Sequence, residues 1–319
     1  MTVAVGIGLM EFPFSSAAAY WRWVDLCEQG GIDSFWQTDR VVSREPILEC
    51  MTAIAAVAGR TKRLKFGMNV VSLALRDPVL VAKQCATIDM LSEGRLLPAF
   101  GVGSPAAPEW KTLNIDTKGR GTKTDEGLEI IKRLWSEPSV DFDGRYYKLT
   151  GASISPRPVQ PDIPMWIGGN SEAAIERTGR IGTGWQAGPE TPSQAGEVVR
   201  AIKAAAARYG RSIDEDHYGA GFPFYFGREG DPILDRAREA YQKRTKRDPA
   251  GYFAVGEAAD IVQRIGEYVE NGVEKFVLRP VGRDDEAIFT QTRRLVEEVL
   301  PEVARRWPKP PKKKANVAE

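Results

Sequence analysis

"PMWIGGNSEAAIERTGRIG", residues 164–182, combines a short apolar run, two glycines and a helical pattern. Met165 to Ile167 predict a short buried strand, and an Asn-Ser pair after the glycines predicts a helix N-cap at Asn170 or Ser171. Glycines let backbone N–H groups approach a ligand, and the dipole of a helix favours an anion at its N-terminus. A phosphate fits this turn physically, and an ordinary capped turn between a strand and a helix explains the same residues.

Strand-like and helix-like segments alternate on both sides of this unit. Eight strand-helix units in one chain predict a parallel sheet closed into a (β/α)8 TIM barrel. The alternative, a doubly wound open sheet, wants Gly-x-Gly-x-x-Gly after the first strand, and "GIGLME" at residues 6–11 has no third glycine. The strands are expected within residues 3–10, 32–38, 63–71, 94–103, 165–167, 182–188, 217–227 and 274–282, and helices within 17–29, 46–58, 78–91, 124–135, 193–209, 257–270 and 285–305.

Two segments interrupt the alternation. Residues 140–151, "VDFDGRYYKLTG", hold an Asp-Gly pair between β-rich runs, which predicts a hairpin excursion. Residues 231–246 predict an extra, charged helix. We see no boundary between two domains, so residues 1–307 are expected to form a single barrel domain. Residues 308–319, "PKPPKKKANVAE", are expected to be a basic, flexible tail.

The composition excludes several classes of protein. The chain has 319 residues and a net charge of +1, which gives no indication of a nucleic-acid or membrane partner. Cys27, Cys50 and Cys85 are scattered and odd in number, which argues against disulfides and fits a reducing cytoplasm. We find no signal peptide and no apolar run long enough to span a membrane. His217 is the only histidine, so zinc and Ser-His-Asp chemistry are disfavoured, and we expect no metal.

In a (β/α)8 barrel the site gathers at the carboxyl ends of the strands. The residues expected there include glycines, small polar groups, arginines and a tryptophan, without an acidic cluster that would hold a metal. Such a set is typical of a site whose chemistry belongs to a bound organic cofactor. These residues are Glu11, Asp39, Arg40, Asn69 to Ser72, Gly103, Ser104, Gly168 to Ser171, Trp185, Gly188 and Arg279.

With these strand ends in place, the chain resembles the bacterial luciferase-like flavin monooxygenase family, whose members are (β/α)8 enzymes that use FMN or the deazaflavin F420. The resemblance covers most of the chain in the family's order. It is carried by "DSFWQTDR" (33–40), "RLKFGMNVVSLALRDPVLVAKQCATIDMLSEGRLLPAFGVGS" (63–104), "DEGLEIIKRLWSEPSVDFDGRYYKL" (125–149), "SPRPVQPDIPMWIGGNSEAAIERTGRIGTGW" (155–185) and "YVENGVEKFVLRP" (268–280).

The resemblance implies a cofactor site. The family binds the cofactor phosphate on the backbone after the fifth strand, which here is Gly168 to Ser171. Asn69 and Val70 match the place where F420-using relatives have a non-prolyl cis peptide bond, and an ordinary strand end with a bulge is the alternative. Ser104 is a candidate contact to the flavin ring or ribityl chain, or a simple capping residue.

The clearest departure from the family is "TDR", residues 38–40. Many relatives have Asp-His or His-His there, and the histidine acts near the flavin. Arg40 stays protonated, so it cannot move a proton at neutral pH. Asp39 and Arg40 are the candidate catalytic pair, with Arg40 holding a reduced flavin, a peroxide or a substrate carboxylate. The alternative is an ion pair between Asp39 and Arg40 that orders the loop.

The remaining candidates concern the substrate. Glu11 is a candidate for the pocket mouth or a solvated loop acid, and Trp110 lies in a loop that is expected to cover the pocket. Trp185 either stacks on a ligand or belongs to the core. Arg279 reaches an anion or forms a salt bridge at the rim. Arg76 and Asp77 are expected to pair locally.

The sequence therefore predicts a flavin-dependent oxidoreductase, in the first place a monooxygenase that uses reduced FMN and O2 on a small organic substrate. A separate flavin reductase would supply the reduced FMN, since no nicotinamide-binding motif is present. One alternative is an F420-dependent oxidoreductase that transfers a hydride, and another is a non-catalytic flavin-binding protein. A barrel lyase or isomerase would want a lysine nucleophile or an acid pair at the strand ends, and neither is found. The family resemblance also implies a homo-oligomer.

Overall fold

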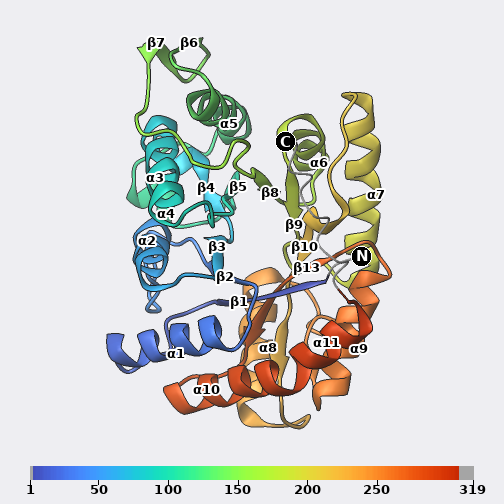
Figure 1. The fold of residues 1–319 in the computed structure, drawn as a ribbon. Coiled ribbons are helices and arrows are strands. Elements are labelled where there is room, and N and C mark those ends of the chain that lie inside the picture. Colours follow the sequence, from blue (N-terminus) through green and yellow to red (C-terminus); the bar gives the residue numbers. More distant parts are fainter. Residues whose placement is uncertain (1–2, 309–319) are drawn as a thin grey trace, which may run out of the picture.

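A computed structural model describes residues 3–308, and nine parallel strands form its central sheet in the order β3-β2-β1-β13-β10-β9-β8-β5-β4 (Figure 1). β3 and β4 are two halves of one predicted strand, and a bridge between Phe66 and Leu96 connects β3 to the chain just before β5. The ring therefore has eight strand positions, which confirms the predicted barrel. The strands are β1 (Ala4–Leu9), β2 (Ser34–Gln37), β3 (Lys65–Met68), β4 (Val71–Ser72), β5 (Ala99–Gly101), β8 (Trp166–Gly168), β9 (Gly184–Gln186), β10 (Tyr218–Ala220) and β13 (Lys275–Pro280).

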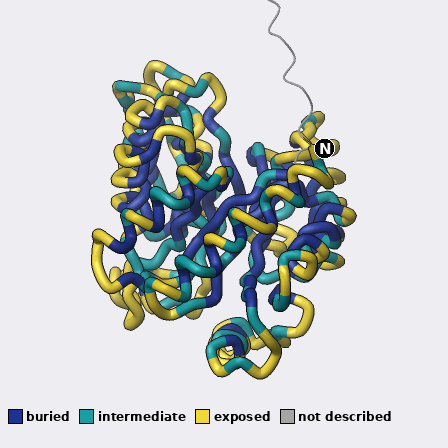
Figure 2. Tube along the Cα trace, turned by 60° about the horizontal axis from the view of Figure 1, so that its bottom comes forward, coloured by how far each residue is buried: buried dark blue, intermediate teal, exposed yellow. Residues whose placement is uncertain are grey.

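Helices surround the strands, and Figure 2 shows the buried chain in the middle and exposed residues along the outside. α1 (Ala17–Gln29) and α3 (Pro78–Leu91) have the predicted bounds. Pro78 lies in the first turn of α3, where its missing N–H is harmless, and Asp77 caps that turn by accepting from two backbone amides. The other helices are α2 (Cys50–Arg60), α5 (Arg120–Ser136), α6 (Glu172–Ile181), α7 (Pro192–Arg208), α9 (Ala258–Val269), α10 (Asp285–Arg294), the π-helical η3 (Leu295–Val299) and α11 (Leu300–Arg306), with short 3-10 turns η1 (Leu73–Leu75) and η2 (Glu215–His217).

The two predicted insertions are present. β6 (Val140–Asp143) and β7 (Lys148–Ala152) form an antiparallel hairpin beside α5, and α8 (Pro232–Thr245) is the extra helix. The strand predicted at residues 217–227 is divided into β10 and β11 (Pro223–Tyr225), and β11 pairs with β12 (Ala254–Val255). α4 (Glu109–Thr112) and β12 were not predicted. Apart from Pro308, the predicted basic tail lies outside the described residues.

Tryptophans fill the interior of the barrel. Trp36 and Trp166 are almost fully buried and meet edge to face, with ring centroids 6.1 Å apart. Glycines on neighbouring strands make room for them, because a Cβ on Gly67 would lie 2.8 Å from the ring of Trp36 and one on Gly184 would lie 2.7 Å from Trp166. The interior is therefore a packed core that forms the floor of any site at the mouth.

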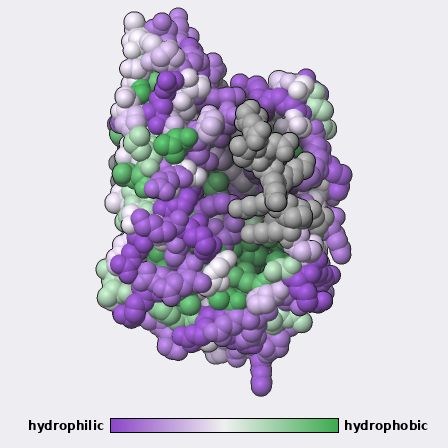
Figure 3. All heavy atoms as spheres, in the orientation of Figure 1, coloured by the Kyte–Doolittle hydropathy of each residue, from purple (hydrophilic) through white to green (hydrophobic). Residues whose placement is uncertain are grey.

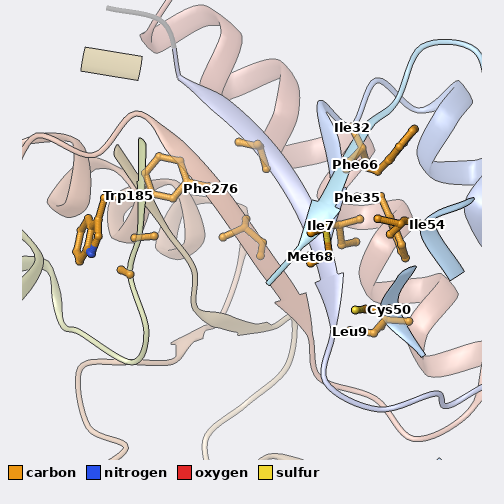
Figure 4. Close-up of a cluster of buried hydrophobic side chains, with 14 of the residues drawn as sticks. Ile7, Leu9, Ile32, Phe35, Cys50, Ile54, Phe66, Met68, Trp185 and Phe276 are labelled. Atoms are coloured by element: carbon orange, nitrogen blue, oxygen red, sulfur yellow. The ribbon is translucent and has the colours of Figure 1, made fainter. Parts of the chain in front are cut away.

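A second apolar layer separates the strands from the helices. Ile7, Phe35 and Phe66 lie in register on β1, β2 and β3 and are fully buried. Figure 4 shows these side chains together with Ile54 of α2. Each buried side chain of this size contributes roughly 1.5–3 kcal/mol by leaving water. Together with the interior layer, this packing holds the strand ends in fixed positions.

The three cysteines are buried and free of disulfides. Hydrophilic residues dominate the face of the molecule shown in Figure 3. Within residues 3–308 no helix is long and apolar enough to cross a membrane.

Candidate functional site

The turn after β8 forms an open cradle at the N-terminus of α6. Gly169 has φ = 112°, a conformation that side-chain-bearing residues rarely adopt, and residues 169–173 are exposed. Ser171 is the N-cap, since its side chain accepts from the amide of Ala174. The preceding first-turn amides have no acceptor inside the helix, so they remain available to an anion. The four residues predicted from the sequence, Gly168 to Ser171, are thus brought together in a geometry that fits a phosphate.

Two buried side chains, Trp185 and Glu190, form hydrogen bonds to this cradle. Trp185 is fully buried, and its indole Nε1 donates to the carbonyl of Gly169 at 2.8 Å. Having no exposed surface, Trp185 holds the turn in place, and the expectation that it stacks on a ligand is replaced by this supporting role. Asn170 donates from Nδ2 to Oε1 of Glu190 at 2.6 Å, which fixes the amide side chain.

Glu190 is an unexpected acid beside a site that suits an anion. It is 3% exposed, and its Oε2 has no hydrogen-bond partner among the described residues. Burial raises the pKa of the Glu190 carboxyl, although Arg247, 3.7 Å from Oε1, and Asn170 act in the opposite direction. Because of the raised pKa, Glu190 stays neutral to a higher pH than an ordinary glutamate, and Arg247 offsets part of the charge of the ionised form.

Asn69 and Val70 lie between β3 and β4. The Asn69–Val70 peptide bond is cis, which confirms the hypothesis drawn from the family resemblance. The side chain of Val70 projects toward two glycines on neighbouring strands, because a Cβ on Gly101 would lie 2.8 Å from its Cγ2 and one on Gly168 would lie 3.0 Å away. Val70 therefore lies at the barrel mouth beside the start of the cradle.

Asp39 and Arg40 do not pair with each other, so the predicted ion pair within the loop is wrong. The Asp39 carboxylate accepts from both terminal nitrogens of Arg76, at 2.6 and 2.9 Å, and from the amide of Ser72 at 2.9 Å. Its side chain is only 2% exposed. The expected local pairing of Arg76 with Asp77 is also wrong, because Arg76 reaches back to the loop after β2. Asp39 thereby ties this loop to β4 and to the start of α3.

Arg40 turns the other way, toward the loop after β5. Its Nε lies 3.1 Å from Oε1 of Glu109, whose side chain is 4% exposed and whose Oε2 has no partner within residues 3–308. Trp110 is buried and donates from Nε1 to the carbonyl of Ser104 at 2.7 Å. These residues enclose a small cavity of about 60 Å³ that also reaches Asp39. Trp110 thus fixes the loop over this side of the mouth, and Ser104 accepts through its backbone.

A larger cavity of about 550 Å³ lies on the other side of the mouth. It is bounded by the segment after β1, the ends of β11 and β13, and α8. β8 is opposite β1 in the ring of strands, so this cavity lies across the mouth from the cradle. Glu11 and Arg279 both line it, in agreement with their predicted positions at the carboxyl ends of the first and last strands. A volume of this size accommodates a small organic ligand.

Sequence reasoning missed Glu109, Glu190 and Arg244, and each has a clear reason. Glu109 and Glu190 follow irregular loops, and nothing local marks an acid as buried. Arg244 lies on α8, an insertion whose docking across the mouth is a tertiary feature. Among the described residues, two groups of side chains have ligand atoms close enough for a metal ion. In the first, Asp39, Glu49 and Cys50, Asp39 is already engaged by Arg76, and the second, Asp214, Asp216 and His217, lies just before β10 on the exposed surface.

Comparison with other proteins places these features in a family. A curated protein of Mycobacterium tuberculosis, itself uncharacterised, is 31% identical over 169 residues, which cover 53% of this chain and 57% of that protein. The chain thus spans little more than half the length of this relative. The F420-dependent glucose-6-phosphate dehydrogenase of Amycolatopsis mediterranei is 26% identical over 314 residues, covering 86% of this chain and 91% of that enzyme.

Solved structures share the fold. A monooxygenase from Streptomyces bottropensis superposes with a TM-score of 0.81 at 20% identity, covering 94% of this chain and 99% of that one. The coenzyme F420-dependent tetrahydromethanopterin reductase from Methanopyrus kandleri superposes with a TM-score of 0.76 at 22% identity, covering 95% of this chain and 100% of that one. The family model of luciferase-like monooxygenases matches residues 7–288. That match spans all eight strand positions of the barrel and the cradle after β8, and the chain belongs to the luciferase-like monooxygenase family.

Proposed function

We propose that this protein is an F420-dependent oxidoreductase that transfers a hydride to or from a small organic substrate. The observation that carries the proposal is the open cradle after β8, which lies across the barrel mouth from a cavity of about 550 Å³. The A. mediterranei relative, matched over most of both chains, is F420-dependent. It supports this alternative better than the FMN-dependent oxygenation that the sequence first suggested.

The residues at the cradle fit a cofactor phosphate. The backbone of residues 169–173 is exposed, and Ser171 leaves the first-turn amides of α6 free to donate. Trp185 fixes the carbonyl of Gly169 from below, so the turn is already ordered before a ligand binds. Arg247 near Glu190 adds a positive charge on the same side. When bound, F420 supplies the hydride chemistry and requires no oxygen.

The chain's own residues have separate tasks in this proposal. Gly169 and the amides of α6 bind and orient the phosphate. The loop pinned by Trp110 and the pair of Arg40 with Glu109 exclude water from the side of the mouth formed by β2, β4 and β5. Arg40 contributes a fixed positive charge, since a guanidinium does not release its proton at neutral pH. Any proton that accompanies the hydride must therefore move through another group or water.

FMN is the second candidate cofactor, and a monooxygenase would then be the activity. Its phosphate fits the same cradle, and the S. bottropensis monooxygenase has the same fold. The non-catalytic flavin-binding alternative predicts cofactor binding without turnover.

The test is a titration of the purified protein with F420 and with FMN, each oxidised and reduced, followed by absorbance and fluorescence. The proposal expects F420 to bind at least tenfold more tightly than FMN, and bound F420 to be reduced or oxidised by substrate without oxygen. Preference for FMN together with oxygen uptake would support the monooxygenase instead. Binding of neither cofactor would overturn the assignment and leave only the barrel.

A further inference from the structure

The large cavity carries an unusual charge distribution. Four arginines line it, two on α8 (Arg236 and Arg244) and two at the end of β13 and just after it (Arg279 and Arg283). Only two acids share the lining, Glu11 and Glu45. Within residues 3–308 no carboxylate oxygen lies within 4.0 Å of the four guanidinium groups, so none of them is neutralised by an ion pair.

Arg244 of α8 and Arg279 of β13 line the same cavity and are close enough for their charges to interact. Arg279 is oriented by a hydrogen bond from Nη1 to the hydroxyl of Tyr252 at 2.8 Å. The ring of Tyr252 in turn stacks on Tyr241, with centroids 4.8 Å apart. The side chain of Arg244 has no hydrogen-bond partner among the described residues, and the residue is exposed.

The two guanidinium groups influence each other. Partial desolvation by the cavity walls lowers the pKa of Arg244 and the positive charge of Arg279 lowers it further, while Glu11 acts in the opposite direction. Both groups stay protonated at neutral pH. Glu11 lines the same cavity but forms no ion pair with either arginine. Two like charges in one cavity, neither of them paired with a carboxylate, attract an oxyanion that bridges them, and the planar fork of each guanidinium suits carboxylate and phosphate oxygens.

The rest of the lining is apolar. It includes Phe12, Ile233, Phe253 and Ile288, together with prolines and alanines. Tyr241 is the only uncharged residue of the lining with a hydroxyl or amide side chain. A ligand rich in hydroxyl groups would leave most of them without partners, and unpaired polar groups reduce affinity strongly.

We propose that the cavity binds the substrate as an amphipathic oxyanion, with a carboxylate or phosphate head between Arg244 and Arg279 and an apolar, preferably aromatic, body against α8 and the segment after β1. That this anion is the substrate rests on the proposed oxidoreductase function, since the cavity faces the cradle across the mouth. The proposal that the cavity binds an anion depends only on the arginines in its lining.

Calorimetric titration of the full-length protein tests the proposal. The probes are 3-phenylpropionate, its neutral amide, 2-phenylethyl phosphate, inorganic phosphate and glucose 6-phosphate. The acid or the phosphate ester is expected to bind most tightly, and which of the two wins identifies the head group. Arg244→Met and Arg279→Met are expected to weaken that binding about 10- to 100-fold each, because each removes a charge-assisted contact. Lys243→Met removes a charge from the same helix outside the cavity lining and is expected to leave binding unchanged.

Several results would overturn the proposal. If the neutral amide binds as tightly as the acid, the ligand need not be an anion. If glucose 6-phosphate binds more tightly than both aromatic anions, the ligand need not have an apolar body. Arg244 is exposed, so its replacement is expected to leave the fold intact. Unchanged binding in Arg244→Met would therefore show that the anion does not lie beside Arg244. Displacement of the bound acid by F420 would assign the arginines to the cofactor. Retained acid binding in a protein that binds no F420 would instead overturn only the proposed function and confirm the anion site.

Discussion

Gly169 has a φ of 112° and would place a Cβ 3.2 Å from the Cβ of Ala174. Gly169→Ala is therefore expected to strain the cradle, to destabilise the protein by about 1–3 kcal/mol and to weaken F420 binding about tenfold or more. Gly210→Ala is the matched control, since Gly210 has φ = 65° with nothing within 4 Å and lies after α7, away from the mouth. Fluorescence titration of both variants decides, and equal affinities would contradict the role of the cradle.

Glu190 lies against the same cradle, and its pKa is raised above the ordinary value, with burial as the main cause. As the pH rises past the ordinary glutamate range, Glu190 ionises and its negative charge repels a bound phosphate. We expect the affinity for F420 to fall with rising pH, and Glu190→Gln to bind several-fold more tightly at neutral pH with a flatter profile. Glu197→Gln, which removes an exposed acid from α7, should keep the profile of the parent protein. Parallel profiles for all three proteins would show that Glu190 does not sense the phosphate.

Between elements, the pair of Asp39 with Arg76 joins the loop after β2 to the start of α3. The two side chains are 2% and 13% exposed, and removing Asp39 leaves the poorly hydrated Arg76 with only the exposed Glu49, 3.3 Å away. Asp39→Ala is expected to lower the free energy of unfolding by about 3–5 kcal/mol, measured in urea. Asp25→Ala breaks the more exposed pair with Arg60 and is expected to cost about 1 kcal/mol or less. If Asp39→Ala is as stable as Asp25→Ala, the pair does not hold the loop.

The bounds of some helices could be predicted from the sequence, whereas the partners of Asp39 and Arg40 could not. α1 and α3 were predicted at their true bounds because apolar spacing, a capping residue and a proline in the first turn are local signals. α4 has only four residues and lies in a loop, so no periodicity marks it. The partners of Asp39 and Arg40 lie 37 and 69 positions further along the chain, and only the closed barrel brings them together.

At the scale of the molecule, the alternation of strands and helices was sufficient to predict the barrel and therefore which residues meet at its mouth. Gly168 to Ser171, Glu11 and Arg279 were placed correctly by that rule alone. The orientation of side chains at the strand ends could not be predicted, because it depends on packing. Trp185 is buried in the core, and Arg279 shares a cavity with Arg244 of an inserted helix. The position of a residue along a strand was predictable, and its partners were not.

Lys275 and Asp33 link the last strand of the barrel to the segment just before β2 at the end remote from the mouth. Their Nζ and Oδ2 atoms are 2.6 Å apart, and the side chains are 6% and 15% exposed. Although burial alone would raise the pKa of Asp33, the ammonium groups of Lys275 and Lys65 hold it well below its ordinary value. A depressed carboxyl pKa stabilises the fold above the unfolded-state value near 3.8, and this contribution is lost as the pH falls further.

Lys275→Met removes the main partner and leaves the Asp33 carboxylate buried. At pH 7 the variant is expected to lose about 3–5 kcal/mol of stability. Only Lys65, 3.5 Å away and more exposed, then remains beside the carboxyl, so the pKa of Asp33 rises above its value in the parent protein. The variant therefore takes up a proton at a higher pH than the parent protein, and the difference in stability should shrink below about pH 4. Urea unfolding at pH 7 and at pH 3.5 measures both differences, with Lys203→Met, which breaks an exposed pair, as the control. A difference that is equally large at both pH values would mean that Lys275 contributes through packing, and that the charge pair does not close this end of the barrel.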